Sequence, residues 1–366
     1  MSARHSTSTI AVVISCFVFA ACGSKTSPAG AAALHVQSPS SGASVGGRIP
    51  VAASLTTGGE GVVSAEFFVD GKSIGRDDSA PFASRPGARF AIPQDASGQV
   101  TLDFSARYRT RVGSSMTVST PITVAAASPA RPTPLTGKKS YRLTFDDEFS
   151  DPAMSDLNWN RQRRDWIKGP IPYSNLEGAG YSPSNVSVSD GLLNLVTSDR
   201  RAGDLPHSTG SVNSNKLFSY KYGYIESKVF VPDCTGCWPS FWQLSVKDHW
   251  PPEIDVFEFF NTEKNGMPYA ALHWSYPDAD KQRYISRKLM PWGSNLVGTW
   301  HTYGMLWTKK IVRVWVDGLQ RVTFKSRHIP RVAMYPIMQL AVGKGYHAPA
   351  GNKMQVDYVR VWQPKR

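Results

Sequence analysis

The sequence predicts an all-β protein built from two β-sandwich domains. Its 366 residues include 30 glycines and 26 prolines, a composition that favours frequent turns over long helices. Short runs of alternating apolar and polar residues recur along the chain, and no segment offers a convincing amphipathic helix of about 12 residues or more. Because 41% of the residues are hydrophobic and 19% are charged, the chain can bury a sizeable core and is not a disordered polyampholyte.

The first domain is predicted over residues 37–126. Alternating runs such as 63–69 and 100–107 are separated by Gly, Ser and Asp clusters, and Asp70-Gly71 is typical of a hairpin turn. This segment resembles the bacterial Ig-like modules that accompany secreted carbohydrate-active enzymes. All 11 tryptophans lie at or beyond Trp159, so none can stack on a sugar here, and we expect a spacer rather than a sugar-binding module.

The second domain is predicted over residues 141–366, after a Pro-rich linker at residues 127–140. Strand-like runs follow one another through it, for example 254–260, 311–316 and 356–362. So many antiparallel strands imply two large stacked sheets in a jelly roll, and a long curved sheet offers a concave face for a polymer.

The N-terminal segment is interpreted as a processing signal. An apolar run at residues 10–21 is too short to span a hydrocarbon core of about 30 Å comfortably, so residues 1–21 are predicted to be a signal peptide and residues 22–36 a tether. Residues 19–24 resemble a bacterial lipoprotein processing box, with Cys22 as the lipidated first residue; ordinary cleavage at a small-residue site is the alternative. We expect an exported protein, secreted or held in the cell envelope, that meets a membrane only through a lipid at Cys22.

Cys234 and Cys237 are expected to form a disulfide with each other. An exported C-x-x-C usually means a disulfide, since a zinc site needs two more ligands at suitable spacing and a thioredoxin-type motif opens a helix.

The charge excess is local. Of the net charge of +13, residues 301–366 supply +10, from 12 basic and 2 acidic side chains. Such a stripe could face phosphates, anionic headgroups or wall polyanions, but the alternation of polar and apolar residues at 312–316 favours a solvated outer face, and we expect no nucleic-acid partner.

Three carboxylates carry the predicted chemistry: Glu253, Asp255 and Glu258 lie within one apolar and aromatic run. On a regular strand Glu258 would point away from the other two into the apolar layer, at a high cost. One inserted residue at Val256 or Phe257, a β-bulge, returns it to their face. A calcium site or an exposed acidic edge is the alternative, but Ile, Val and Phe do not flank an exposed edge, and calcium usually recruits further oxygen ligands at alternating positions.

With the bulge, the carboxyl groups of Glu253 and Glu258 lie about 5 Å apart, the separation of a retaining glycosidase. One carboxylate attacks the anomeric carbon while the other, kept protonated, donates its proton to the leaving oxygen. Asp255 between them would hydrogen-bond the nucleophile and help raise the pKa of the acid.

Residues 250–258 (WPPEIDVFE) resemble the active-site strand of glycoside hydrolase family 16, in the bulged form of its laminarinase-like branch. Similar matches at 144–149, 222–226, 238–242 and 356–362 extend the resemblance over residues 141–366, and it implies a concanavalin A-like jelly roll. It also implies that Glu253 is the nucleophile, Asp255 its assistant and Glu258 the acid/base.

The resemblance implies further site residues. Trp238, Trp242 and Trp250 would stack on sugars and His273 would line the site, although each Trp is as readily a core residue and a lone His is more often structural. Family members often hold a structural calcium, for which the matching residues are Glu148 and Asp357. Catalysis itself needs no cofactor.

The expected activity is endo-hydrolysis of β-1,3- or mixed-linkage glucan by a monomer whose partner is the polysaccharide. Ser211 and Pro252 depart from positions where family β-1,3-glucanases often have Arg and Gly, and bulged members also act on galactans such as agar and carrageenan. A transglycosylase and a non-catalytic, wall-tethered glycan-binding protein are the remaining alternatives.

Overall fold

The computed structural model describes residues 32–365 except 59–60, 94–95, 127–128, 139, 162–171, 248, 261–266, 276–281 and 291–294. The predicted signal peptide, Cys22 and most of the predicted tether therefore lie outside the described residues. Among the residues described, no helix is long and apolar enough to cross a membrane.

The N-terminal domain is a β-sandwich, as predicted, and its first strand begins at Ala33, inside the segment predicted to be tether. One sheet has the order β1-β4-β7, a second β2-β10-β9-β5-β6, and β3 pairs with β8. Phe67 and Phe104 are fully buried between the layers. The strands are β1 (Ala33–Ser38), β2 (Ser44–Val45), β3 (Arg48–Pro50), β4 (Ala52–Thr56), β5 (Val62–Val69), β6 (Lys72–Asp77), β7 (Phe82–Ala83), β8 (Arg89–Ala91), β9 (Gly98–Thr110) and β10 (Ser115–Ala126).

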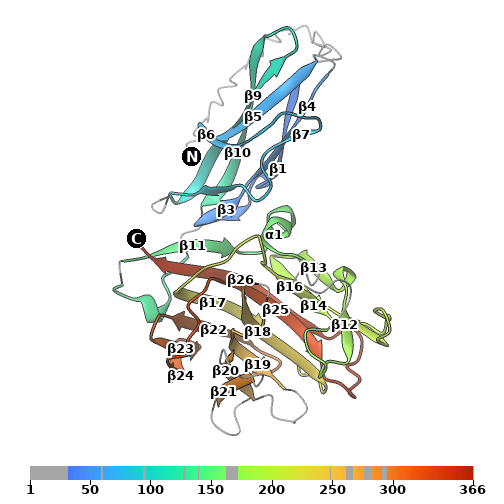
Figure 1. Cartoon of the computed structure of the whole chain (residues 1–366), viewed down its shortest axis with the longest axis vertical. Coiled ribbons are helices and arrows are strands. Elements are labelled where there is room, and N and C mark those ends of the chain that lie inside the picture. Colours follow the sequence, from blue (N-terminus) through green and yellow to red (C-terminus); the bar gives the residue numbers. More distant parts are fainter. Residues whose placement is uncertain are drawn as a thin grey trace, which may run out of the picture.

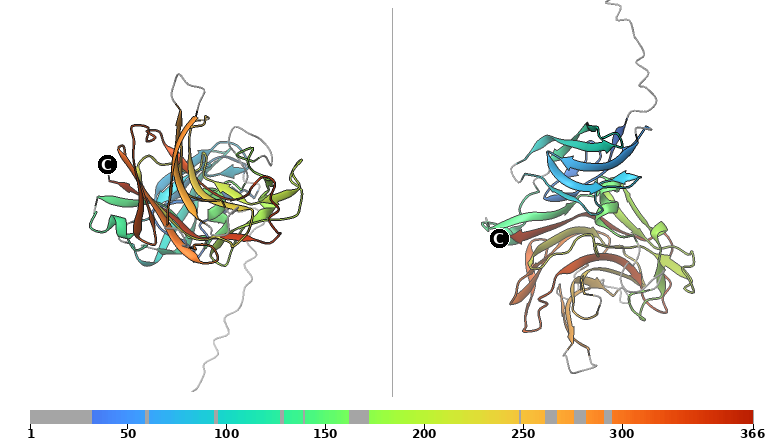
Figure 2. Two further views of the ribbon diagram at one scale, coloured as in Figure 1. Left: turned by 90° about the horizontal axis from the view of Figure 1, so that it is seen from below. Right: turned by 45° about the horizontal axis from the view of Figure 1, so that its top comes forward.

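The second domain stacks two large sheets, which confirms the predicted jelly roll, and its strands are visibly curved (Figure 2). Apolar side chains from both sheets, such as Phe257 and Val359, fill the space between them. The outer sheet contains β13 (Val186–Ser189), β14 (Leu192–Val196), β26 (Lys353–Pro364), β17 (Gly223–Phe230), β22 (Trp300–Trp307), β23 (Ile311–Val316) and β24 (Leu319–Lys325) in that order, with β11 (Tyr141–Asp147) also paired to β26.

The inner sheet carries the predicted catalytic strand in its interior. Its order is β16 (Ser211–Asn213), β25 (Met334–Val342), β18 (Cys237–Ser245), β19 (Glu253–Phe259), β20 (Pro268–Ser275) and β21 (Gln282–Lys288). The smaller elements of this half are α1 (Pro152–Asn158), η2 (Pro183–Asn185) and the pair β12 (Ala179–Tyr181) and β15 (His207–Thr209).

The two domains meet where β3 of the first lies beside β11 and α1 of the second (Figure 1). The Arg89 guanidinium donates to Asn158 Oδ1 at 2.7 Å and lies 5.6 Å from the Phe145 ring. The described part of the linker also contacts the second domain, since its short helix η1 (Thr133–Leu135) buries Leu135 completely. The junction is therefore built from specific contacts.

Candidate active site

Strand β19 contains the predicted bulge. Against β18, Phe241 pairs with Phe257 and the next residue, Trp242, pairs with Asp255, so Val256 is the extra residue. Val256 and Phe257 consequently both enter the apolar core. Glu258 is thereby returned to the face that carries Glu253 and Asp255, as the sequence predicts.

Each outer carboxylate receives a hydrogen bond from a tryptophan. Trp250 Nε1 donates to Glu253 Oε2 at 2.8 Å, and Trp238 Nε1 donates to Glu258 Oε1 at 3.2 Å. Trp250 is 37% exposed, so its ring is open to a ligand while its N–H fixes the carboxylate. These tryptophans therefore orient the acids, a role that the sequence did not suggest.

His273 joins the group from the neighbouring strand, because β20 places it directly opposite Glu253. Its Nε2 lies 3.1 Å from Asp255 Oδ2 and 3.4 Å from Glu253 Oε1. The side chain of Asp255 is only 1% exposed and its Oδ1 makes no hydrogen bond within the described structure. His273 is thus the polar contact that holds the central acid from the neighbouring strand.

Burial raises the pKa of all three carboxyl groups. For Glu258 the neighbouring charge of Asp255 adds to the effect of burial, so its pKa lies well above the ordinary range. For Asp255, burial raises the pKa to about 8 against the lowering effect of the hydrogen-bonded Glu253. Burial and Asp255 likewise raise the pKa of Glu253, while His273 and the Trp250 N–H oppose the rise. A protonated carboxylic acid at neutral pH is what general acid catalysis requires.

Of the expected stacking residues, Trp242 is 6% exposed and packs with Leu244, Tyr335 and Ile337. Tyr173 covers it edge-on, with ring centroids 4.9 Å apart. Trp242 is therefore largely a packing residue in this structure, whereas Trp250 offers an accessible ring.

Sequence analysis did not predict two residues that lie near the acids. Tyr284 on β21 is 68% exposed and stacks on His273, with centroids 5.6 Å apart and an interplanar angle of 22°. Glu177, which precedes β12, is buried, and its charge adds to the rise in the pKa of Glu258. Nothing in the local sequence of either residue signals the site, because each is brought there by strands from elsewhere in the chain.

Cys234 and Cys237 form the predicted disulfide, with their Cα atoms 5.4 Å apart. The bond closes the turn that leads into β18, immediately before Trp238. Gly236 in this turn has φ +84°, and a Cβ there would lie 2.7 Å from the Cβ of Tyr346. The turn therefore requires glycine and sets the start of the strand that presents Trp238.

The carboxylates expected to bind calcium are held by basic side chains. Arg360 donates to both oxygens of Glu148, from Nε at 2.5 Å and Nη2 at 2.7 Å, and Lys228 Nζ lies 2.7 Å from Asp357 Oδ2. Calcium takes 6–8 oxygen ligands, and neither acid belongs to a group of three metal-ligating side chains in the part of the chain described. This arrangement does not fit a calcium ion, and no step below uses one.

A family model decides the affiliation of the second domain. The model of the glycosyl hydrolases family 16 matches residues 178–360, and that of a bacterial Ig domain matches residues 33–107. The chain belongs to glycosyl hydrolases family 16. The family 16 domain also includes β11, which lies outside the matched range but pairs with β26 in the outer sheet.

Relatives of the family 16 domain are distant. The chain is 29% identical over 244 residues to the clotting factor G alpha subunit of Tachypleus tridentatus, covering 61% of this chain and 34% of that protein. It is 28% identical over 247 residues to an endo-1,3-1,4-beta-glycanase of Rhizobium meliloti, covering 60% and 51%. It thus spans a third to a half of the length of these relatives.

Among solved structures, a non-specific endo-beta-1,3(4)-glucanase from family GH16 is similar, with a TM-score of 0.52 and 27% identity. The alignment covers 62% of this chain and 92% of that structure. The shared part therefore corresponds to nearly the whole of that glucanase.

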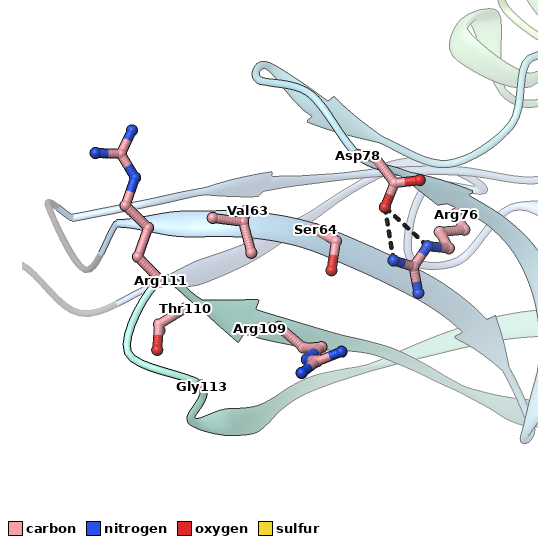
Figure 3. Close-up of a pocket in the computed structure, with 8 residues that line it drawn as sticks. All are labelled: Val63, Ser64, Arg76, Asp78, Arg109, Thr110, Arg111 and Gly113. Carbon is pink, nitrogen blue, oxygen red and sulfur yellow. Dashed lines mark hydrogen bonds and ion pairs between the residues drawn. The ribbon is translucent and has the colours of Figure 1, made fainter.

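The described residues of the Ig-like domain offer no group of side chains comparable to the acids of β19. A depression of about 430 Å³ lies over β5, β6 and β9, where Arg76 pairs with Asp78 at 2.7 Å (Figure 3). None of the described side chains that line it is aromatic, so it lacks the flat ring on which a sugar stacks. These features agree with the expected role of a spacer.

Proposed function

We propose that this protein is an endo-acting, retaining glycosidase that cleaves β-1,3- or mixed-linkage glucan. The observation that carries the proposal is the bulge in β19, which places Glu253, Asp255 and Glu258 on one face with a tryptophan N–H on each outer acid. A retaining glycosidase uses one carboxyl group as the nucleophile and a second as the acid/base, and Glu253 and Glu258 are available for these two roles.

Glu258 acts as the acid. Burial and the adjacent Asp255 raise its pKa, so it holds the proton that the leaving oxygen needs. Glu253 attacks the anomeric carbon as the anion. Burial and Asp255 raise its pKa, and His273 and the Trp250 N–H oppose that rise by favouring the charged form. In the second half of the reaction Glu258, now ionised, takes a proton from water, and the resulting hydroxide displaces Glu253.

Asp255 acts between the two outer acids. It is hydrogen-bonded to Glu253, and His273 holds it at 3.1 Å. The two acids can therefore share a proton, which adjusts the charge on the nucleophile as the covalent bond forms and breaks. When Asp255 is ionised, its charge also favours the protonated form of Glu258. Both effects keep the roles of the two glutamates distinct.

The glucan assignment rests on similarity and on accessible aromatic rings. The names of the relative from Rhizobium meliloti and of the solved glucanase both specify 1,3 and 1,4 linkages. Beside the acids, Trp250 and Tyr284 present rings that are 37% and 68% exposed, which suits stacking on pyranose faces.

The test is a panel of laminarin, lichenan, agarose and carrageenan, followed by reducing-end assays and product chain lengths. We expect early release of medium-length fragments from laminarin or lichenan, with the first product anomer retained by NMR. Cleavage of agarose or carrageenan alone would assign a galactan hydrolase, and redistributed chain lengths without new reducing ends a transglycosylase. Binding without cleavage would assign a glycan-binding protein, and wild-type turnover by Glu253→Ala would refute the assigned roles.

We also propose that the protein is exported and that a lipid on Cys22 is its only membrane anchor. The disulfide between Cys234 and Cys237 supports an oxidising compartment. Cell fractionation of the wild type and Cys22→Ala tests this: the wild type should follow the membranes and the variant the soluble exported fraction. Equal distribution of both would indicate ordinary signal cleavage.

A further inference from the structure

A cluster of two histidines and one aspartate lies outside the candidate active site. Asp199 follows β14, His207 begins β15, and His347 lies between β25 and β26. Asp199 Oδ1 is 3.4 Å from His347 Nε2 and 3.7 Å from His207 Nδ1. The three ligand atoms all lie within 4.8 Å of one another.

These distances do not describe hydrogen bonds. A hydrogen bond between nitrogen and oxygen is typically 2.7–3.2 Å long, and both separations exceed that range. His207 Nδ1 is buried and makes no hydrogen bond in the part of the chain described, although its ring turns this atom toward Asp199. A buried imidazole nitrogen without a partner indicates that a further atom belongs between the three side chains.

The spacing suits a metal ion. Zinc binds nitrogen and oxygen ligands at about 2.0–2.2 Å, so two of its tetrahedral ligands lie about 3.3–3.6 Å from each other. The observed separations of 3.4 and 3.7 Å are close to that value. Two imidazoles and one carboxylate are ligands of zinc and its neighbours among the transition metals, whereas calcium and magnesium prefer oxygen alone.

The backbone holds the ligands in place. Ser198 and Ser208 exchange two backbone hydrogen bonds, at 2.8 and 3.0 Å, and so fix Asp199 beside His207. Thr197 donates from Oγ1 to the carbonyl of Pro349 at 2.6 Å, which ties this segment to the loop that carries His347. The three side chains thus converge from elements that are already joined to each other.

We propose that Asp199, His207 and His347 form a transition-metal site that binds one Zn²⁺ ion, with water in the remaining position. The side chains of Asp199 and His347 are 63% and 61% exposed, so the ion can enter from solvent. Once bound, it links the connection between β14 and β15 to the connection between β25 and β26 and stabilises both loops. The site does not depend on the proposed glucanase activity.

The test is calorimetric titration of the metal-free full-length protein with Zn²⁺. We expect one ion per chain for the wild type and at least about 100-fold weaker binding for His347→Ala and Asp199→Ala, because loss even of a group that only supports a ligand weakens metal binding by about 10–100-fold. The matched control is His301→Ala, which removes a partly buried histidine 2.7 Å from the single carboxylate of Asp317 and should bind Zn²⁺ like the wild type. Equal affinity in the wild type and His347→Ala would overturn the proposal.

A second variant separates this site from the acids of β19, since Glu253, Asp255 and His273 also gather three potential ligands. Glu253→Gln should keep the tight Zn²⁺ ion; if it loses the ion and His347→Ala keeps it, the metal belongs to the catalytic group and the proposal is wrong. At Zn²⁺ concentrations about 100-fold above Kd, the apparent Tm of the wild type should rise by about 5 °C and that of His347→Ala should not. The same melting curves without metal show whether each variant folds.

Discussion

Two buried aspartates of this protein, Asp147 on β11 and Asp255 on β19, show how similar acids acquire different roles. Neither is more than 1% exposed, and burial is the largest influence on the pKa of both. Asp147 accepts hydrogen bonds from one backbone N–H and three side chains, and its pKa is about 6. Asp255 has one hydrogen bond, to His273, besides the one that it shares with Glu253, and its pKa is about 8.

The neighbours of the two aspartates differ in the same way. Glu148 beside Asp147 is neutralised by a bidentate contact to Arg360, whereas Glu253 and Glu258 beside Asp255 receive single tryptophan N–H groups. Several hydrogen-bond donors and a fixed cation stabilise the ionised form of a structural carboxylate. A buried carboxyl group with few donors can instead hold or release a proton near neutral pH. The number of hydrogen-bond donors around each carboxylate, rather than burial, therefore separates the structural acids from the reactive ones.

The largest expected effect is on turnover. Glu258→Gln keeps an oxygen to accept the Trp238 N–H but has no proton to donate, so kcat should fall by about 10²–10⁴-fold. Initial rates on the preferred glucan measure the loss, and melting curves should show an unchanged fold. A loss of less than tenfold would place the acid elsewhere.

The second effect is on stability. Asp147→Ala leaves buried donors of Ser155, Asn158 and Trp159 without an acceptor, so the free energy of unfolding should fall by about 3–5 kcal/mol. Urea unfolding measures this change. Asp156→Ala, in which the lost carboxylate is 53% exposed, is the matched control and should lose at most about 1 kcal/mol. Equal losses in both variants would refute the structural role of Asp147.

The third effect concerns pH. The pKa of Asp255 is about 8 in the folded protein and about 3.9 in an unfolded chain, so the folded state binds this proton more tightly. The stability that it contributes is complete below about pH 4 and is lost as the pH rises toward 8. Asp255→Asn does not titrate, and its free energy of unfolding should decline less than that of the wild type between pH 5 and 8. Parallel curves of the two proteins would contradict the raised pKa.

The smallest effect is expected at the surface. Lys228→Met removes the partner of Asp357, but their side chains are 40% and 36% exposed, so the change in the free energy of unfolding should be about 0.5 kcal/mol. A loss above about 2 kcal/mol would show that this pair belongs with the buried structural acids. Calorimetry with Ca²⁺ on the same variant also tests whether Asp357 binds calcium once the Lys228 ammonium group is removed.

The sequence predicts features that depend on near neighbours. The bulge follows from the count of residues between Asp255 and Glu258, and the disulfide follows from the spacing of Cys234 and Cys237. Features that depend on distant partners were not predictable. Arg360 binds Glu148 across 212 residues, a pairing without a local signal, whereas the family resemblance implied calcium at Glu148.

Sequence analysis also failed to predict other contacts between residues that are distant along the chain. Trp242 was expected to face sugar, but Tyr173 covers it from a loop that precedes its strand by many residues. The stacking of Tyr284 on His273 likewise requires the register of β20 and β21, in which the two residues are opposite each other. Such pairings are set by tertiary structure and leave no local pattern.

The extra residue in β19 makes the arrangement of the acids tolerant of its own loss but not of a further gain. Without Val256, four positions would separate Glu253 from Glu258, and plain alternation would keep all three acids on one face of a regular strand, with Phe257 still in the core. One more residue between Asp255 and Glu258 would instead turn Glu258 toward the layer between the sheets, because the single bulge absorbs only one extra position. A codon gained here would therefore separate the trio without altering any acidic residue, and an alignment that scores residue identity alone would rate such a variant as intact.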